Sequence, residues 1–164
     1  MEKSTQNLKE AFAGESQANR KYLAFAEKAD REGYPQVARL FRAAAEAETV
    51  HALNHLRALK GIGATAANLK EALAGEVAEF EKMYPPMIAA AQSEGNKEAE
   101  RTFSFANEVE KIHAQLFKKA LDRMEKKELV DIFVCAVCGY TVEGEAPDKC
   151  PVCSAVKKMF KQIS

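Results

Sequence analysis

A glutamate interrupts the apolar stripe of each of four consecutive predicted helices, and this pattern constrains the fold more than any other feature. Glycine and proline are sparse in the first 130 residues, and the main breaks fall near positions 33–35, 61–63 and 94–96. The stretches between are rich in the helix formers Ala, Glu, Lys and Leu. They predict helices over roughly residues 4–31, 36–60, 66–93 and 97–127, with a kink or short break at Pro85 and Pro86.

The four glutamates fall at one depth of the bundle that these helices predict. Residues at spacings of three and four form the inward stripe of each helix. Apart from these carboxylates and a few other polar residues, the stripes are mainly apolar. Counting from the breaks places Glu15, Glu48, Glu76 and Glu110 at about the same level. Unpaired carboxylates inside a bundle are costly, and metal cations offset that cost.

Two of the helices add a histidine three residues after the glutamate, in Glu48-x-x-His51 and Glu110-x-x-His113. A single pair of this kind usually lies on a solvated helix face. The spacings from Glu15 to Glu48 and from Glu76 to Glu110 are nearly equal, however, so the two helix pairs resemble two copies of one unit. The combined set predicts a di-iron or di-manganese carboxylate bundle.

All four cysteines of the chain lie near its end, as Cys135-x-x-Cys138 and Cys150-x-x-Cys153. Two such pairs hold one tetrahedral metal, and four thiolates suit both iron and zinc. With the strand-like run 131–134 beside them, they predict a second, small domain. We therefore expect a helical domain over residues 1–130 and a four-cysteine domain over residues 131–164.

Composition excludes several classes of function. The 24 basic and 24 acidic side chains cancel, which argues against binding to nucleic acid or to an anionic membrane surface. No apolar run is long enough to span a membrane, and the first residues are charged where a signal peptide would be apolar. We expect a cytoplasmic protein.

Several motifs together resemble the rubrerythrin family over essentially the whole chain. They are Glu76-x-x-Glu79, the strings AFAGES, MYP and EKIHAQLF, and the trailing cysteine pairs with Cys-Gly-Tyr. The resemblance implies a ferritin-like four-helix bundle followed by a rubredoxin-like domain, which favours iron in the four-cysteine site. One departure is Ser154, where the second cysteine pair is often followed by Gly, a residue that tolerates positive φ.

The resemblance also implies roles for individual residues. In the oxidised state the di-iron ligands would be Glu15, Glu48, Glu76, Glu79, Glu110 and His113, and the mononuclear iron would be held by Cys135, Cys138, Cys150 and Cys153. On reduction one iron would leave Glu79 for His51. Tyr22 and Tyr84 correspond to tyrosines that hydrogen-bond site carboxylates in the family.

The implied activity is reduction of hydrogen peroxide to water. The resemblance also implies that electrons come ultimately from NAD(P)H through a separate reductase or a free rubredoxin. This chain has no glycine-rich nucleotide fingerprint of its own. The competing interpretations are a ferroxidase that handles iron and a zinc-ribbon interaction module on a structural bundle.

The short link between the second and third predicted helices indicates how the bundle is assembled. Ferritin-like bundles run those two helices parallel, which requires a connection as long as a helix. Residues 61–65 can span only about 17 Å, against about 38 Å for a 25-residue helix. We therefore expect a homodimer with exchanged helix pairs, the alternative being a simple up-down-up-down bundle.

Overall fold

The computed structural model describes residues 2–164, which form two compact units that divide after Gly63. The first unit contains helices α1 (Lys3–Arg31) and α2 (Pro35–Ala58). The second contains α3 (Thr65–Ala78), the π-helical segment η1 (Glu79–Met83), α4 (Tyr84–Glu94) and α5 (Lys97–Arg123). It continues through the 3₁₀ turn η2 (Met124–Lys126) into strands β1 (Ile132–Cys135), β2 (Thr141–Glu143) and β3 (Phe160–Ile163), with turn η3 (Lys157–Met159) before β3.

The mainly helical fold class expected from the sequence, with a small cysteine-rich strand region at its end, is confirmed. The predicted breaks also match the helix ends. Gly33 adopts a left-handed φ of 81° between α1 and α2, and Pro35 opens α2, where its missing N–H costs nothing. Gly95 ends α4 with a φ of 69°, and the Asn96 side chain caps α5 by accepting from Ala99 N–H.

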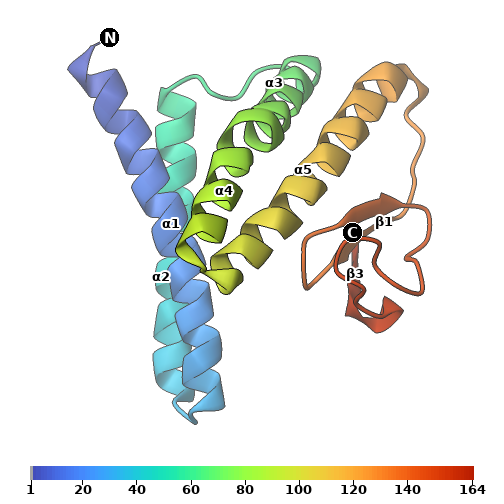
Figure 1. The fold of residues 1–164 in the computed structure, drawn as a ribbon. Helices are drawn as coiled ribbons and strands as arrows, with labels where there is room; N and C mark the ends of the chain where they lie inside the picture. Colours follow the sequence, from blue (N-terminus) through green and yellow to red (C-terminus); the bar gives the residue numbers. More distant parts are fainter. Residues whose placement is uncertain (1) are drawn as a thin grey trace. The chain divides into compact units, whose positions relative to one another are not determined.

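In the first unit, α1 and α2 lie side by side as a helical hairpin (Figure 1). Alanines fill the interface between the two helices: Ala26, Ala29, Ala38, Ala45 and Ala52 are all buried. Such small side chains bring the two helices close together. The larger apolar side chains stay open, as Phe25 is 46% exposed and Leu40 is 68% exposed. The hairpin therefore lacks a core of large side chains.

In the second unit, α3 and α4 both pack against α5, where Ala91, Val109 and Ala114 are buried. The three strands form an antiparallel sheet of order β2-β1-β3, in which Phe133 lies opposite Val142 on one side and Gln162 on the other. The sheet also contacts α5, and Lys119 forms an ion pair with Glu143 of β2.

The predicted kink in the third helix is present as the π-helical segment η1. Tyr84 N–H donates to the carbonyl of Glu79, five residues earlier, in place of the usual four. Pro85 and Pro86 follow at once and have no N–H to offer the carbonyls of Glu81 and Lys82. The wider turn therefore occurs where a regular α-helix could not complete its hydrogen bonds.

Candidate metal centres

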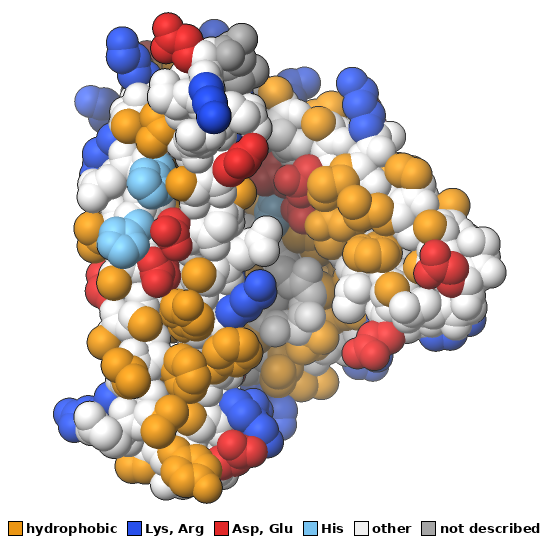
Figure 2. Space-filling model, turned by 90° about the vertical axis from the view of Figure 1, so that its left-hand side faces the viewer, with side chains coloured by type: hydrophobic (Ala, Val, Ile, Leu, Met, Phe, Trp, Pro, Cys, Tyr) orange, Lys and Arg blue, Asp and Glu red, His pale blue; other side chains and the backbone are white. Residues whose placement is uncertain are grey.

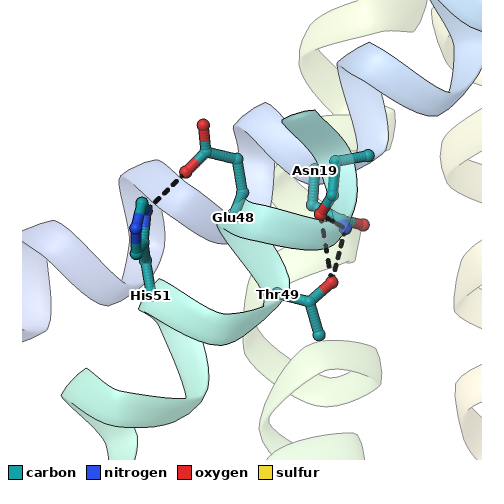
Figure 3. Close-up of polar contacts among 5 residues, drawn as sticks. Asn19, Glu48, Thr49 and His51 are labelled. Atoms are coloured by element: carbon teal, nitrogen blue, oxygen red, sulfur yellow. Dashed lines mark hydrogen bonds and ion pairs between the residues drawn. The ribbon is translucent and has the colours of Figure 1, made fainter. Parts of the chain in front are cut away.

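The first candidate cluster consists of Glu15 on α1 with Glu48 and His51 on α2. One ligand atom from each of these residues lies within 4.8 Å of the other two. His51 Nδ1 is 2.8 Å from Glu48 Oε2, a contact that the i, i+3 spacing on one helix allows (Figure 3). The hairpin brings Glu15 to the same level from α1, so three donors gather in a single unit.

Two polar side chains beside this cluster fix the position of α1 against α2. The buried Asn19 amide donates to the carbonyl of Ala45 at 2.7 Å and to the hydroxyl of Thr49 at 2.8 Å (Figure 3). Asn19 is one turn from Glu15, and Thr49 is adjacent to Glu48. These bonds therefore set the relative height of the two carboxylates. Helix periodicity does not predict their pairing, because it depends on which faces of the two helices meet.

The second cluster repeats the pattern with Glu76 on α3 and Glu110 and His113 on α5. His113 Nδ1 is 2.8 Å from Glu110 Oε2 and 3.7 Å from Glu76 Oε2. The two imidazoles differ in exposure, since the His113 side chain is 27% exposed and that of His51 is 54% exposed. The second cluster is thus the more enclosed of the two at its histidine.

Electrostatics in the second cluster favour a bound cation. Burial raises the pKa of Glu76, and the neighbouring Glu110 raises it further by hydrogen bonding and by charge, against an opposing effect of His113. Burial, and then the charge of Glu76, likewise raise the pKa of Glu79. A metal ion would supply the positive charge that these crowded carboxylates lack. Carboxylate oxygens and imidazole nitrogens are also suitable ligands for iron or manganese.

Glu79 occupies the first position of the π-helical segment η1. The structure does not place it in the group of mutually close donors formed by Glu76, Glu110 and His113. It nevertheless lies close enough for the charges of Glu76 and His113 to affect its pKa. Single-turn π segments occur often at functional sites. The role of Glu79 as a ligand stays a prediction.

The two predicted tyrosines lie in different surroundings. Burial raises the pKa of Tyr84, and the charges of Glu110, Glu79 and Glu76 add to this, so its hydroxyl is a neutral group near the carboxylates. Tyr22 belongs to an aromatic group with Phe25 and Phe41 on the hairpin. Neither hydroxyl has a hydrogen-bond partner among residues 2–164. The bonds to site carboxylates therefore stay predictions.

The third cluster consists of all four cysteines. Their Sγ atoms lie within 4.8 Å of one another, with Cys135 to Cys153 at 3.7 Å and Cys138 to Cys150 at 3.5 Å. A tetrahedral site with metal–sulfur bonds of about 2.3 Å has edges of about 3.8 Å. The thiols are free, and Cys135 and Cys150 are buried. The spacing therefore fits one metal ion better than disulfides.

The two cysteine loops have matching backbones. Gly139 N–H donates to the carbonyl of Cys135, and Ser154 N–H donates to that of Cys150, each at 2.9 Å. Gly139 has a φ of 83° and Ser154 a φ of 62°. Burial acts to raise the pKa of Cys135, but hydrogen bonds from the backbone N–H groups of Val137 and Cys138 and from the neighbouring thiols together lower it overall. Such N–H groups stabilise thiolate sulfur, the form that binds a metal.

Each of these clusters lies entirely within one of the two units, so the carboxylate and histidine donors are divided between them. The hairpin holds Glu15, Glu48 and His51, while the second unit holds Glu76, Glu110 and His113. Three donors cannot complete the coordination of two metal ions.

None of the helices in the described part of the chain is sufficiently long and apolar to cross a membrane.

Comparison with known proteins gives a consistent result over both parts of the chain. Residues 6–121 match the family described as rubrerythrin, and residues 133–161 match the rubrerythrin rubredoxin-like domain. The chain is 39% identical to rubrerythrin-2 of Clostridium acetobutylicum, an alignment that covers 94% of this chain and 93% of the relative. It is 37% identical to nigerythrin of Nitratidesulfovibrio vulgaris, over 94% of this chain and 84% of the relative.

Among solved structures, partially reduced nigerythrin is similar with a TM-score of 0.61 and 34% identity, covering 99% of this chain and 88% of the other. Together with the donor sets described above, these matches identify the cysteine cluster as a rubredoxin-like iron site. The two Glu–Glu–His clusters are groups positioned for a di-iron site.

Proposed function

Because the chain belongs to the rubrerythrin family, an oxidoreductase family, we propose that it is a peroxidase that reduces hydrogen peroxide to water. The observation that supports this most is the presence in one chain of two carboxylate–histidine clusters and a four-thiolate cluster. When bound, two ferrous ions supply the two electrons that, with two protons, convert one peroxide into two waters. The four-thiolate iron would replenish these electrons one at a time.

The protein's own residues would hold and orient the reacting groups. The carboxylates of Glu15, Glu48, Glu76, Glu79 and Glu110, with His113, would bind the iron pair in its oxidised state. The neutral hydroxyl of Tyr84, near Glu110, is available as a hydrogen-bond donor to a carboxylate or to bound peroxide. Tyr22 would serve the same purpose from the hairpin.

His51 would replace Glu79 as a ligand when the iron pair is reduced. The hydrogen bonds of the two histidines support a mobile role for His51. Within residues 2–164 its Nε2 has no hydrogen-bond partner, whereas His113 is held at both ring nitrogens. An imidazole fixed at only one nitrogen can turn more easily than one fixed at two.

The electron donor would be a separate protein. A reductase using NAD(P)H, or a free rubredoxin, would deliver electrons to the iron held by Cys135, Cys138, Cys150 and Cys153. Four free thiols kept for a metal suit the reducing cytoplasm, which is where we propose that the protein acts. We also propose the domain division at residue 130, which the family matches at 6–121 and 133–161 support.

The complete di-iron site would form in a homodimer with exchanged helix pairs. Only residues 59–64 connect α2 to α3. Six residues span at most about 21 Å, whereas the 24 residues of α2 are about 36 Å long. A parallel arrangement of α2 and α3 within one chain is therefore out of reach. Exchange supplies the second half of the site from the partner chain and retains the geometry of the family.

Exchange would also cover the apolar surface that the hairpin leaves open. Phe25, Val37 and Leu40 are each more than 40% exposed. Figure 2 shows hydrophobic side chains along the face of the molecule seen from the α1 side, with acidic side chains and histidines among them. A partner's helices would bury this surface together with the cluster.

A ferroxidase that feeds iron storage is the second candidate, because its carboxylate bundle is of the same type. The test compares steady-state peroxide reduction, with an added NAD(P)H-linked reductase, with uptake of ferrous iron under oxygen. We expect catalytic peroxide turnover and about three bound irons per chain, two in the bundle and one in the cysteine site. Iron uptake far beyond that ratio without peroxide turnover would favour the ferroxidase. Zinc alone, with no red ferric thiolate colour, would favour a zinc-ribbon module.

A further inference from the structure

The cysteine domain is in direct contact with the bundle histidine through one hydroxyl group. Thr141 is the first residue of β2 and follows the first cysteine pair by three residues. Its Oγ1 lies 3.0 Å from His113 Nε2 and 3.0 Å from the carbonyl oxygen of Gly139.

The direction of each hydrogen bond follows from the atoms involved. A carbonyl oxygen only accepts, so Thr141 uses its single hydroxyl hydrogen on the carbonyl of Gly139. Its oxygen can then only accept from His113. The Nε2 atom of His113 must therefore carry a hydrogen, and in the neutral imidazole Nδ1 is left with its lone pair free.

The free lone pair is on the nitrogen that faces the carboxylates. His113 Nδ1 is the atom that lies 2.8 Å from Glu110 and 3.7 Å from Glu76. A metal ion binds neutral imidazole through an unprotonated nitrogen, and the hydrogen bond made by the other nitrogen determines which one that is.

We propose that Thr141 is a positioning residue that holds His113 in the tautomer able to bind metal and anchors the first cysteine loop to the same imidazole. The anchoring of the cysteine loop follows from Gly139. Its carbonyl accepts from Thr141, and its N–H donates to the carbonyl of Cys135. Hydrogen bonds through Thr141 and Gly139 thus join His113 to the backbone of a cysteine ligand. The inference rests on the proposed role of His113 in the di-iron site.

The hairpin histidine has no equivalent support, which makes the comparison informative. His51 forms the same 2.8 Å contact with its own glutamate through Nδ1. Among the described residues, nothing accepts a hydrogen bond from its Nε2. The two halves of the site therefore resemble each other in ligands and differ in how the imidazole is held.

The hydroxyl can be removed without displacing β2. The ion pair between Lys119 and Glu143 joins β2 to α5 independently of Thr141, and β2 pairs with β1 from Thr141 to Glu143. Thr141→Val keeps the shape and the β-branched side chain and removes only the hydroxyl. Thr141→Ser keeps the hydroxyl and serves as the matched control.

Two measurements on the full-length protein test the proposal. The first is the rate at which a ferrous chelator removes bundle iron. We expect at least about tenfold faster loss from Thr141→Val, the usual size of an outer-ligand effect, and near-native loss from Thr141→Ser. The red colour of the cysteine iron shows whether that domain remains folded in each variant.

The second measurement reports the histidine itself. In the zinc-loaded full-length protein labelled with ¹⁵N-histidine, we expect a slowly exchanging Nε2–H on His113 in the native and Thr141→Ser chains. In Thr141→Val this hydrogen should exchange much faster with water. Equal iron retention and equal exchange in all three proteins would overturn the proposal. Failure of the native protein to reduce peroxide would reject the peroxidase instead, since neither measurement depends on turnover.

Discussion

At the scale of single residues, the left-handed backbone of Ser154 is a stability cost that can be removed. Its φ of 62° matches the 83° of Gly139 in the companion loop, but only glycine adopts this conformation without penalty. We expect Ser154→Gly to stabilise the four-cysteine domain by about 1 kcal/mol. Thermal loss of the ferric thiolate absorbance measures this.

Gly139→Ser is the matched control and should destabilise the domain by a similar amount, about 1 kcal/mol. A Cβ at position 139 would lie 3.8 Å from Val109 Cγ1, an ordinary contact, so conformation alone should determine the result. If Ser154→Gly did not raise the stability of the domain, the loop would accommodate serine in this conformation at no cost.

The raised pKa of Glu76 makes a prediction about the metal-free protein. Burial and the nearby Glu110 favour its protonated form, so the folded chain binds this proton more tightly than the unfolded chain. The contribution of this group to stability is therefore present in acid and lost as pH rises through the raised folded pKa. Glu76→Gln should stabilise the iron-free chain at pH 7 by an amount on the order of 1 kcal/mol.

Urea unfolding of the iron-free chains measures this difference, which should shrink as the pH falls toward about 4. The exposed Glu71→Gln on the same helix controls for the loss of one charge. A Glu76→Gln chain that is less stable than native at pH 7 would contradict the argument. With iron present the order should reverse, because the substitution removes a ligand.

His51 is the residue whose replacement should separate turnover from stability. We expect His51→Ala to retain the fold and the cysteine iron but to lose at least about tenfold in peroxide turnover. His55→Ala, one turn further along α2, is the control and should keep most of the activity. Native turnover by His51→Ala with full iron occupancy would reject the exchange of ligands between Glu79 and His51.

Residue patterns predicted most of the candidate site but not its supports. Glu15, Glu48 and His51 meet as the spacing indicates, because positions on a helix are fixed by its period. Thr141 could not be found in this way, since its partner His113 is on another element and the contact depends on how the sheet packs on α5. The hydrogen bond between the side chains of Asn19 and Thr49 could not be predicted for the same reason.

At the scale of elements, the π-helical segment η1 separates α3 from α4 and determines how Pro85 is tolerated. Pro85 is the second residue of α4, a first-turn position where a missing N–H is unimportant. We expect Pro85→Ala to change stability by less than about 1 kcal/mol, against about 3 kcal/mol for a proline inside a helix. Denaturant unfolding of the iron-loaded protein gives the value.

Ala89→Pro in the middle of α4 is the comparison and should destabilise by about 3 kcal/mol or more. A large gain in stability from Pro85→Ala would show that the helix is strained at this position. The sequence predicted a kink at the prolines, but not that the irregular turn would precede them and begin at Glu79. The position of a π-helical turn depends on which backbone carbonyls are paired with N–H donors. Residue propensities do not predict this pairing.

At the scale of the whole molecule, exchange of helix pairs predicts complementation between inactive chains. Glu48→Ala disables the hairpin cluster and Glu110→Ala disables the other. If each site takes one cluster from each chain, a mixed dimer contains one intact site and one doubly defective site. Unfolding the two variants together and refolding them with iron should therefore restore a measurable part of the native activity per site.

Each variant refolded alone is the control and should stay inactive. Mixed dimers verified by mass, with two intact cysteine irons and no peroxide turnover, would contradict exchange and favour a bundle closed within one chain. The short link at residues 61–65 raised this question from the sequence, and residues 59–64 connect the two helices in the structure. The sequence alone could not choose between the arrangements, because both satisfy the same helix periods.

The confinement of each ligand cluster to one unit also bears on the order of events during synthesis. The hairpin needs only residues up to Gly63, and its contacts are local, so it can fold while the rest of the chain is still being made. Glu15, Glu48 and His51 would then meet before Glu76 has emerged from the ribosome. The nascent chain would carry half of a binding site, and final assembly would wait for the last-made helices.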